Sequence, residues 1–146
     1  MANERAVVVG AGGISRAWFP PLQAENVEVV GLVDLDRERA RAQAAKYDLD
    51  PLISDDLAGT LRKTKPDFVV DLTTPEAHCE VTCTALEAGT HVIGEKPMAS
   101  SMDEAERMVK ASEDNGKLYM VSQSRRWDRK HAMARDTIEA GEIGTV

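Results

Sequence analysis

The sequence predicts an α/β fold built on a doubly wound parallel sheet. Three observations carry this prediction: short apolar runs alternate with segments of helical length, the runs lack polar alternation, and the helical segments have recognisable ends. Strands buried on both faces are continuously apolar, and strict alternation of strand and helix requires right-handed crossovers. The 146 residues suit one ordinary domain, which can bury about two thirds of its unfolded surface.

In the first half of the chain, apolar runs and helix signals follow one another in order. The expected elements are a strand over 5–9, a helix over 14–23, a strand over 27–33, a helix over 37–47, a short strand at 52–53 and a helix over 55–62. Val, Ile and Leu dominate the expected strands, as β structure favours. Asp36 has the spacing of an N-cap for the second helix, where its carboxylate can accept backbone N–H groups.

The second half continues the alternation. The expected elements are a strand over 67–72, a helix over 75–88, a strand over 91–94, a helix over 102–115, a strand over 118–122 and a helix over 128–140. Thr74 followed by Pro75 is typical of an N-cap with proline at the first helical position, and Gly89 ends that helix. Ser101 and Glu104 have the spacing of a capping box.

Composition and charge exclude several classes of protein. With 18 basic and 25 acidic residues the net charge is −7, which argues against a general nucleic-acid binder. No apolar run reaches the roughly 18 residues of a membrane span, and the N-terminus lacks a signal-peptide pattern, so we expect a cytoplasmic protein without membrane contact. Cys79 and Cys83 suit one helix face better than a disulfide, and His78 adds no fourth ligand, so no metal site is expected.

A glycine-rich turn lies between the first strand and the first helix. Gly10, Gly12 and Gly13 precede Ile14 and Ser15 in this turn. Glycines here permit a tight turn and a close approach of the backbone to a pyrophosphate, which then lies at the positive end of the helix. Ser15 stands at the third glycine position of the usual pattern, where its side chain is expected to cost some closeness between helix and strand.

The second strand ends in Asp34, nineteen residues after Ser15. A carboxylate at this place can accept hydrogen bonds from both hydroxyls of an adenosine ribose, and it repels a 2′-phosphate. We therefore expect dinucleotide binding, with NAD favoured over NADP. Arg37 would favour NADP instead, because its guanidinium could reach a 2′-phosphate.

Two further loops follow strands whose carboxyl ends should meet at one edge of the sheet. The first contains Thr73, Thr74, Pro75 and His78, and we expect this turn to line the cofactor groove. The second contains Glu95 and Lys96. Beside a nicotinamide, the lysine would hydrogen-bond a substrate hydroxyl or polarise a carbonyl during hydride transfer. The sequence leaves open whether the bond from Lys96 to Pro97 is cis.

The order GAGGIS, GLVDLD, TTPEAH, GEKP and RRW, closed by EAGEIGTV, resembles the N-terminal part of the glucose-fructose oxidoreductase, inositol dehydrogenase and rhizopine catabolism (Gfo/Idh/MocA) family. The resemblance implies a Rossmann domain that binds NAD or NADP, followed in family members by an α/β domain with a large open sheet. It also implies oxidation or reduction of a sugar, a cyclitol or a related polyol.

The resemblance implies a role for individual residues. The cofactor-binding residues would be Gly10, Gly12, Gly13, Ile14, Asp34, Thr73, Thr74, Pro75, His78 and Glu95. Lys96 would be the catalytic or substrate-positioning lysine, and Arg126 with Trp127 match the segment that leads out of the Rossmann domain. Two positions depart from the family pattern: Ser15 replaces a glycine, and Glu76 stands where members often carry asparagine.

The resemblance further implies a division of the chain. Residues 1–124 would form the cofactor domain, and residues 125–146 would form an exit helix and the start of a second α/β domain, the rest of which is absent. Family members usually carry their catalytic histidine in that second domain, and His131 does not replace it. We therefore expect a fragment that binds NAD without turnover, because proton transfer is worth about 10²–10⁴ in rate.

Other interpretations stay open at this point. A non-catalytic, dinucleotide-sensing regulatory module would use the same fold, although it has no need of Lys96. Hydrolysis of a glycoside through transient oxidation of the sugar is a further alternative within the family. Exposed apolar residues at Ile138, Ile143 and Val146 would let two copies of the fragment associate.

Overall fold

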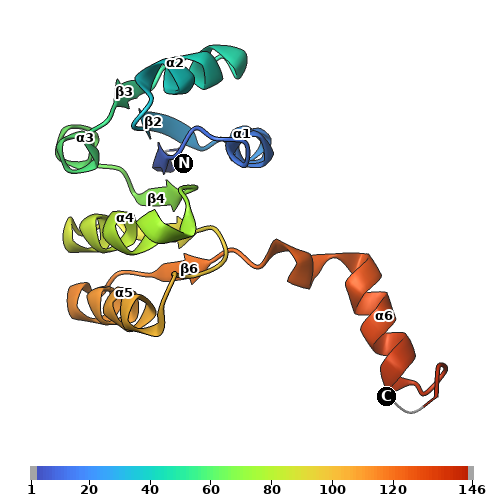
Figure 1. Ribbon diagram of the computed structural model, residues 1–146. Helices are drawn as coiled ribbons and strands as arrows, with labels where there is room; N and C mark the ends of the chain where they lie inside the picture. The colour runs from blue at the N-terminus through green and yellow to red at the C-terminus, as the bar shows by residue number, and fades with distance from the viewer. Residues whose placement is uncertain (1–2, 145–146) are drawn as a thin grey trace.

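The computed structural model describes residues 3–144, which form a parallel sheet covered by helices on both faces (Figure 1). The strands are β1 (Arg5–Val9), β2 (Glu28–Val33), β3 (Leu52–Ser54), β4 (Phe68–Asp71), β5 (His91–Gly94) and β6 (Tyr119–Val121). They lie in the order β3-β2-β1-β4-β5-β6, and all five pairings are parallel. The predicted doubly wound sheet is confirmed, including the short strand at Leu52 and Ile53.

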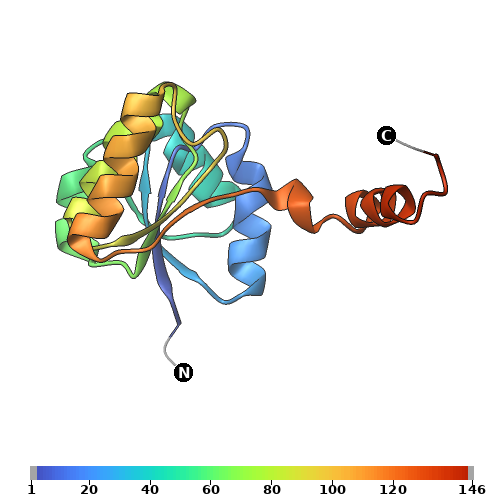
Figure 2. The ribbon, with the colours of Figure 1, turned by 90° about the horizontal axis from the view of Figure 1, so that it is seen from below.

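Two helices cover one face of the sheet and three cover the other (Figure 2). The helices are α1 (Ser15–Ala24), α2 (Arg37–Lys46), α3 (Leu57–Thr64), α4 (Pro75–Glu87) and α5 (Met102–Asn115). Alternate side chains of β1 enter the two cores: Val7 packs on the side of α3, α4 and α5, and Val8 on the side of α1 and α2. Because β1 is buried on both faces from Ala6 to Val9, all four of these residues are apolar.

Helix ends follow the predicted signals in most places. The Asp36 carboxylate accepts the N–H groups of Glu38 and Arg39 at 3.1 Å each, which confirms it as the cap of α2. Thr74 is the N-cap residue of α4, although its side chain makes no capping hydrogen bond. The strands predicted over 67–72 and 118–122 are each one residue shorter at both ends.

The predicted capping box at the start of α5 is wrong in one of its two bonds. Ser101 Oγ accepts the N–H of Glu104 at 3.3 Å, as the motif requires. The Glu104 carboxylate instead accepts the N–H of Ser100 at 3.0 Å, one residue before the cap. The glutamate still satisfies a backbone donor ahead of the helix, but with a shifted register.

Cys79 and Cys83 are free thiols on the core-facing side of α4, which confirms the helix-face interpretation. Burial raises the pKa of Cys83 to about 11, so this thiol stays protonated at neutral pH. Within residues 3–144, no helix is long and apolar enough to cross a membrane. No group of three or more His, Cys, Asp or Glu side chains in that range is arranged to hold a metal ion.

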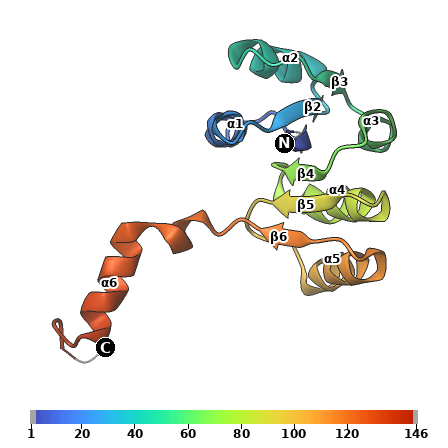
Figure 3. The same cartoon turned by 180° about the vertical axis from the view of Figure 1, so that it is seen from behind.

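The C-terminal segment leaves the sheet (Figure 3). A 3-10 turn, η1 (Ser124–Trp127), precedes α6 (Arg129–Glu139), and neither contains a buried residue. The helix expected over 128–140 is confirmed, whereas the 3-10 turn was not expected. Ile138 and Ile143 are exposed as predicted; Val146, named with them, lies outside the described residues.

The packing of Gly31 in β2 yields a first prediction. A Cβ at this position would lie 2.7 Å from Thr60 Cγ2 and 3.0 Å from Val7 Cγ2, both fully buried. We expect Gly31→Ala to lower the free energy of unfolding by about 1–3 kcal/mol, the usual cost of overpacking a core. Urea denaturation of the purified chain measures this change.

Gly94 in β5 supplies the matched control. A Cβ there would meet the Tyr119 ring at 3.4 Å, an ordinary contact, so Gly94→Ala should leave the stability unchanged or slightly raised. Equal stability of Gly31→Ala and the wild type would contradict the packing of α3 against β2.

Candidate functional site

A groove of about 780 Å³ lies beyond the carboxyl ends of β1, β2 and β4. The chain continues from β1 to one side of the sheet, and β4 begins the other half, so the groove lies where the strand order reverses. Ligands of doubly wound sheets bind at such points. Seven of the predicted site residues line this groove: Gly10, Gly12, Gly13, Ile14, Asp34, Thr73 and Thr74.

The glycine turn contains two kinds of glycine. Gly10 has φ +97°, and a Cβ there would lie 2.7 Å from the Leu72 carbonyl oxygen, so the backbone path itself requires glycine. A Cβ on Gly12 would meet no protein atom within 4 Å. Protein packing therefore does not explain Gly12, whereas a ligand that approaches the backbone from the groove does. This open face fits the pyrophosphate of a dinucleotide.

Ser15 occupies the first turn of α1 without disturbing it. The residue is fully buried, and its Oγ donates a hydrogen bond to the Gly12 carbonyl at 2.7 Å. The Ser15 N–H points to the same oxygen at 3.2 Å. The hydroxyl that replaces the third glycine of the usual pattern thus ties the turn to the helix start.

Asp34 directly follows β2, and its side chain is only 6% exposed. Its Oδ2 accepts the Ala11 N–H at 2.7 Å, and its Oδ1 accepts the Asp36 N–H at 2.8 Å. Burial by itself raises the pKa of Asp34, but the hydrogen bonds from Arg39 and from these two backbone amides outweigh it. The pKa of Asp34 therefore lies below its ordinary value of 3.8, and the carboxylate is charged at neutral pH.

The cation beside Asp34 is Arg39, which sequence reasoning missed. Its Nη2 lies 2.6 Å from Asp34 Oδ1 and its Nε 3.2 Å from Oδ2, a two-pronged contact. Arg37, the candidate proposed from the sequence, is exposed at the first position of α2. The predicted N-cap could have indicated Arg39. With Asp36 capping α2, Arg39 lies three positions later, in the first turn of the helix, and its side chain turns back toward the end of β2.

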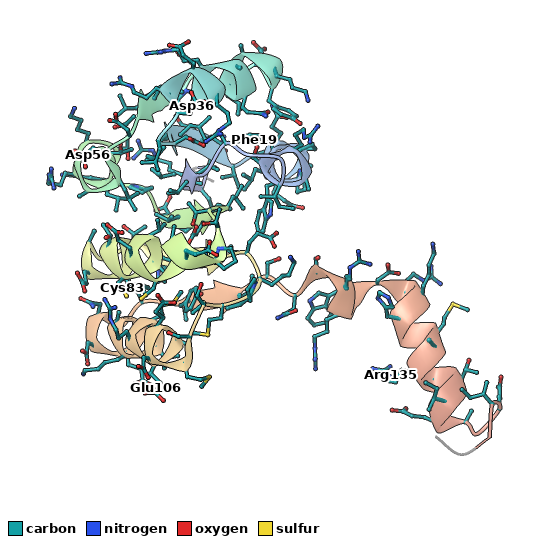
Figure 4. All side chains as sticks on the ribbon, viewed as in Figure 1. Phe19, Asp36, Asp56, Cys83, Glu106 and Arg135 are labelled. Atoms are coloured by element: carbon teal, nitrogen blue, oxygen red, sulfur yellow. The ribbon has the colours of Figure 1, made fainter. Side chains whose placement is uncertain are left out.

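Aspartates cap the two helices that follow β2 and β3, and Figure 4 labels both of them. Asp36 caps α2, and Asp56 caps α3 by accepting the Gly59 N–H at 2.9 Å. Asp55 and Asp56 belong to the groove lining together with Arg39. This end of the groove is therefore strongly charged, with one cation among several carboxylates.

The Thr73 turn is held by a buried carboxylate at the end of β4. Asp71 is fully buried, and its Oδ1 accepts the N–H and the hydroxyl of Thr73 at 3.0 and 2.6 Å. His78 was expected to border the cofactor, but it is only 1% exposed and is not among the residues that line the groove. Its Nδ1 lies 3.0 Å from Asp71 Oδ2, behind the wall.

The loop after β5 is tied to two other elements. The Glu95 N–H donates to the Asp71 carbonyl at 2.9 Å, and Glu95 Oε1 accepts the indole N–H of Trp18 at 2.9 Å. Lys96 is exposed, its peptide bond to Pro97 is cis, and its own N–H donates to Glu95 Oε2 at 3.2 Å. The bond to Trp18 in α1 was not predicted, because nothing in the sequence pairs positions so far apart.

The sequence matches a family model described as an oxidoreductase family with an NAD-binding Rossmann fold, Gfo/Idh/MocA, over residues 4–123. Inositol 2-dehydrogenase of Salmonella typhimurium is 30% identical over 143 residues, covering 96% of this chain and 43% of that protein. The chain therefore spans less than half the length of the curated relatives that it matches.

Solved structures show the same fold. The WlbA dehydrogenase of Bordetella pertussis, in complex with NADH and UDP-GlcNAcA, has a TM-score of 0.82 and 28% identity, covering 95% of this chain and 40% of that one. A 3-ketoreductase from Actinomadura kijaniata, in complex with NADP, has a TM-score of 0.87 and 26% identity, covering 98% and 46%. The two structures hold different dinucleotides on similar folds.

The environment of Asp34 predicts a pH-dependent contribution to stability. Because its pKa is lower in the folded chain, ionised Asp34 stabilises the fold at pH values above 3.8, and this contribution is lost as the pH falls through the folded pKa. We expect Asp34→Asn to lower the free energy of unfolding by about 1–3 kcal/mol at neutral pH, and by less at an acidic pH below 3.8 at which the carboxylate becomes protonated in the folded chain.

Urea denaturation at both pH values measures the two differences. Asp50→Asn, an exposed position, serves as the control and should change neither value. A loss that is the same at both pH values would mean that the charge of Asp34 does not stabilise the fold.

Proposed function

Since the chain belongs to the Gfo/Idh/MocA oxidoreductase family with its NAD-binding Rossmann fold, we propose that the groove binds NAD or NADP for hydride transfer to or from a sugar or polyol. The observation that carries this proposal is the open face of Gly12, which lies in a groove at the switch point of the sheet. The proposed division is a cofactor domain over residues 1–124, followed by a connection over 125–146.

The glycine turn and the start of α1 form the pyrophosphate site in this proposal. Gly10, Gly12 and Gly13 let the backbone approach the phosphates, and the N-terminus of α1 supplies a favourable dipole. Thr73 and Thr74 form the neighbouring wall, with Pro75 starting α4 just behind them. Each of these groups lies at the carboxyl edge of the sheet.

Asp34 is proposed to bind the adenosine ribose, in competition with Arg39. A carboxylate has about four acceptor positions, and Asp34 already receives Ala11 N, Asp36 N and two nitrogens of Arg39. Ribose hydroxyls can therefore bond to Asp34 only where Arg39 gives way. The carboxylate favours NAD over NADP, while Arg39 offsets part of its repulsion of a 2′-phosphate.

Lys96 and Glu95 are proposed to serve the reacting end of the groove. Bound nicotinamide supplies the carbon that accepts or donates the hydride. The Lys96 ammonium, exposed beyond β5, is proposed to hydrogen-bond the substrate oxygen and polarise it. Glu95 holds the Lys96 backbone and is itself fixed by Trp18. The proton acceptor is proposed to come from a second domain, so the 146-residue chain alone should not turn over a polyol.

Binding of NADH to the purified chain tests the proposed function. We expect an increase in NADH fluorescence that saturates, and no polyol-dependent reduction of NAD. Gly12→Val should weaken binding at least about tenfold, since its side chain occupies the space left for the pyrophosphate. Its melting temperature should stay near that of the wild type, because a Cβ on Gly12 meets no protein atom. Unchanged NADH affinity of this variant would contradict the assigned pyrophosphate site.

The choice between NAD and NADP is tested at Arg39. Arg39→Leu removes the cation beside the ribose site and should raise the Kd of NADPH about tenfold or more relative to the Kd of NADH. Arg37→Leu, two residues earlier and exposed, is the matched control and should leave the ratio unchanged. A shift of the ratio by Arg37→Leu alone would favour the candidate named from the sequence.

A further inference from the structure

We propose that His78 is a positioning residue, which acts through Nδ1 and the Asp71 carboxylate to hold the Thr73 wall of the groove in place. This inference rests on the proposed function of the groove as a dinucleotide site. It assigns to His78 a role behind the wall rather than a contact with the cofactor.

The pair is isolated from solvent. The side chain of His78 is 2% exposed and that of Asp71 is 0% exposed. His78 and Thr82 lie one turn apart on α4, so both reach the end of β4, and Thr82 Oγ1 donates to Asp71 Oδ2 at 3.3 Å. Burial of this depth is costly for a carboxylate unless donors surround it, and Asp71 has donors on both oxygens.

Only one of the two imidazole nitrogens of His78 has a hydrogen-bond partner among the described residues. Nδ1 lies 3.0 Å from Asp71 Oδ2, whereas Nε2 is buried and has no hydrogen-bond partner among the described residues. Since Thr73 N, Thr73 Oγ1 and Thr82 Oγ1 already donate to Asp71, the carboxylate is the acceptor and the shared proton lies on Nδ1. The polar function of His78 is thus a single N–H group.

Asp71 connects the Thr73 turn, which lines the groove, to the loop that contains Glu95. Its carboxylate fixes the backbone and the hydroxyl of Thr73, which lines the groove. Its carbonyl accepts the N–H of Glu95, the residue that precedes Lys96. Loss of the Nδ1 donor would leave a buried acceptor without one of its partners and would loosen the residue that joins the two loops.

Two substitutions of equal charge separate the roles of the two ring nitrogens. The amide nitrogen of asparagine can occupy the place of Nδ1, and that of glutamine reaches toward the place of Nε2. We expect His78→Asn to keep the NADH affinity within about twofold and His78→Gln to weaken it about tenfold. His131→Asn, in the exposed helix α6, is the control and should bind NADH like the wild type.

The measurements are the Kd of NADH by fluorescence titration and the melting temperature of each variant. Similar melting temperatures with different Kd values for the Asn and Gln variants support positioning, because a purely structural role would move both variants alike. Equal affinities of these two variants, or rescue by Gln instead of Asn, would overturn the inference. Absence of NADH binding by the wild type would overturn the proposed function instead.

The wild-type chain provides a second measurement that requires no variant to fold. Nitrogen-15 NMR of the histidine rings distinguishes a nitrogen that carries a proton from one that does not. We expect the proton of His78 on Nδ1 and a bare Nε2, with and without NADH. A proton on Nε2 alone would overturn the inference whatever the binding data show.

Discussion

The close approach of Gly10 to the Leu72 carbonyl is the constraint on which the groove depends. The ends of three strands meet here: the Gly10 N–H donates to the Val33 carbonyl at 2.8 Å, and the Leu72 N–H donates to the Val9 carbonyl at 2.8 Å. A side chain on Gly10 would push β1 and β4 apart at the point where the strand order reverses. The groove depends on the absence of a side chain at residue 10, which lets the backbone pass close to the Leu72 carbonyl.

Buried carboxylates fix the turns around that point. Asp34 directly follows β2 and Asp71 ends β4. Each carboxylate accepts backbone N–H groups from residues that follow or adjoin its strand. The two carboxylates therefore hold the conformation of loops whose backbone N–H groups have no partner in a neighbouring strand. Asp34 differs from Asp71 in its surroundings, because one partner of Asp34 is a half-exposed arginine, whereas the Asp71 side chain is fully buried; we propose ligand recognition only for Asp34.

Most of the fold could be predicted because its signals are local. Continuous apolar runs mark the strands, and Asp36 marks a helix start by spacing alone. Side-chain partners could not be predicted as well, since they depend on which residues the folded sheet brings together. Arg39 instead of Arg37, the bond of Trp18 to Glu95 and the burial of His78 all arise from contacts across elements. The Glu104 carboxylate accepts the N–H of Ser100 instead of the expected N–H of Ser101, because capping geometry tolerates a shift of one residue.

The two tryptophans lie in different environments, so their fluorescence can be distinguished. Trp18 is partly buried and donates a hydrogen bond to Glu95 in the loop after β5, while Trp127 is 83% exposed in η1, away from the sheet. An aqueous quencher such as acrylamide reaches the second indole far more readily than the first. The emission that survives quenching therefore comes from Trp18, so the chain carries a built-in reporter for the Glu95 loop and a separate one for its C-terminal segment.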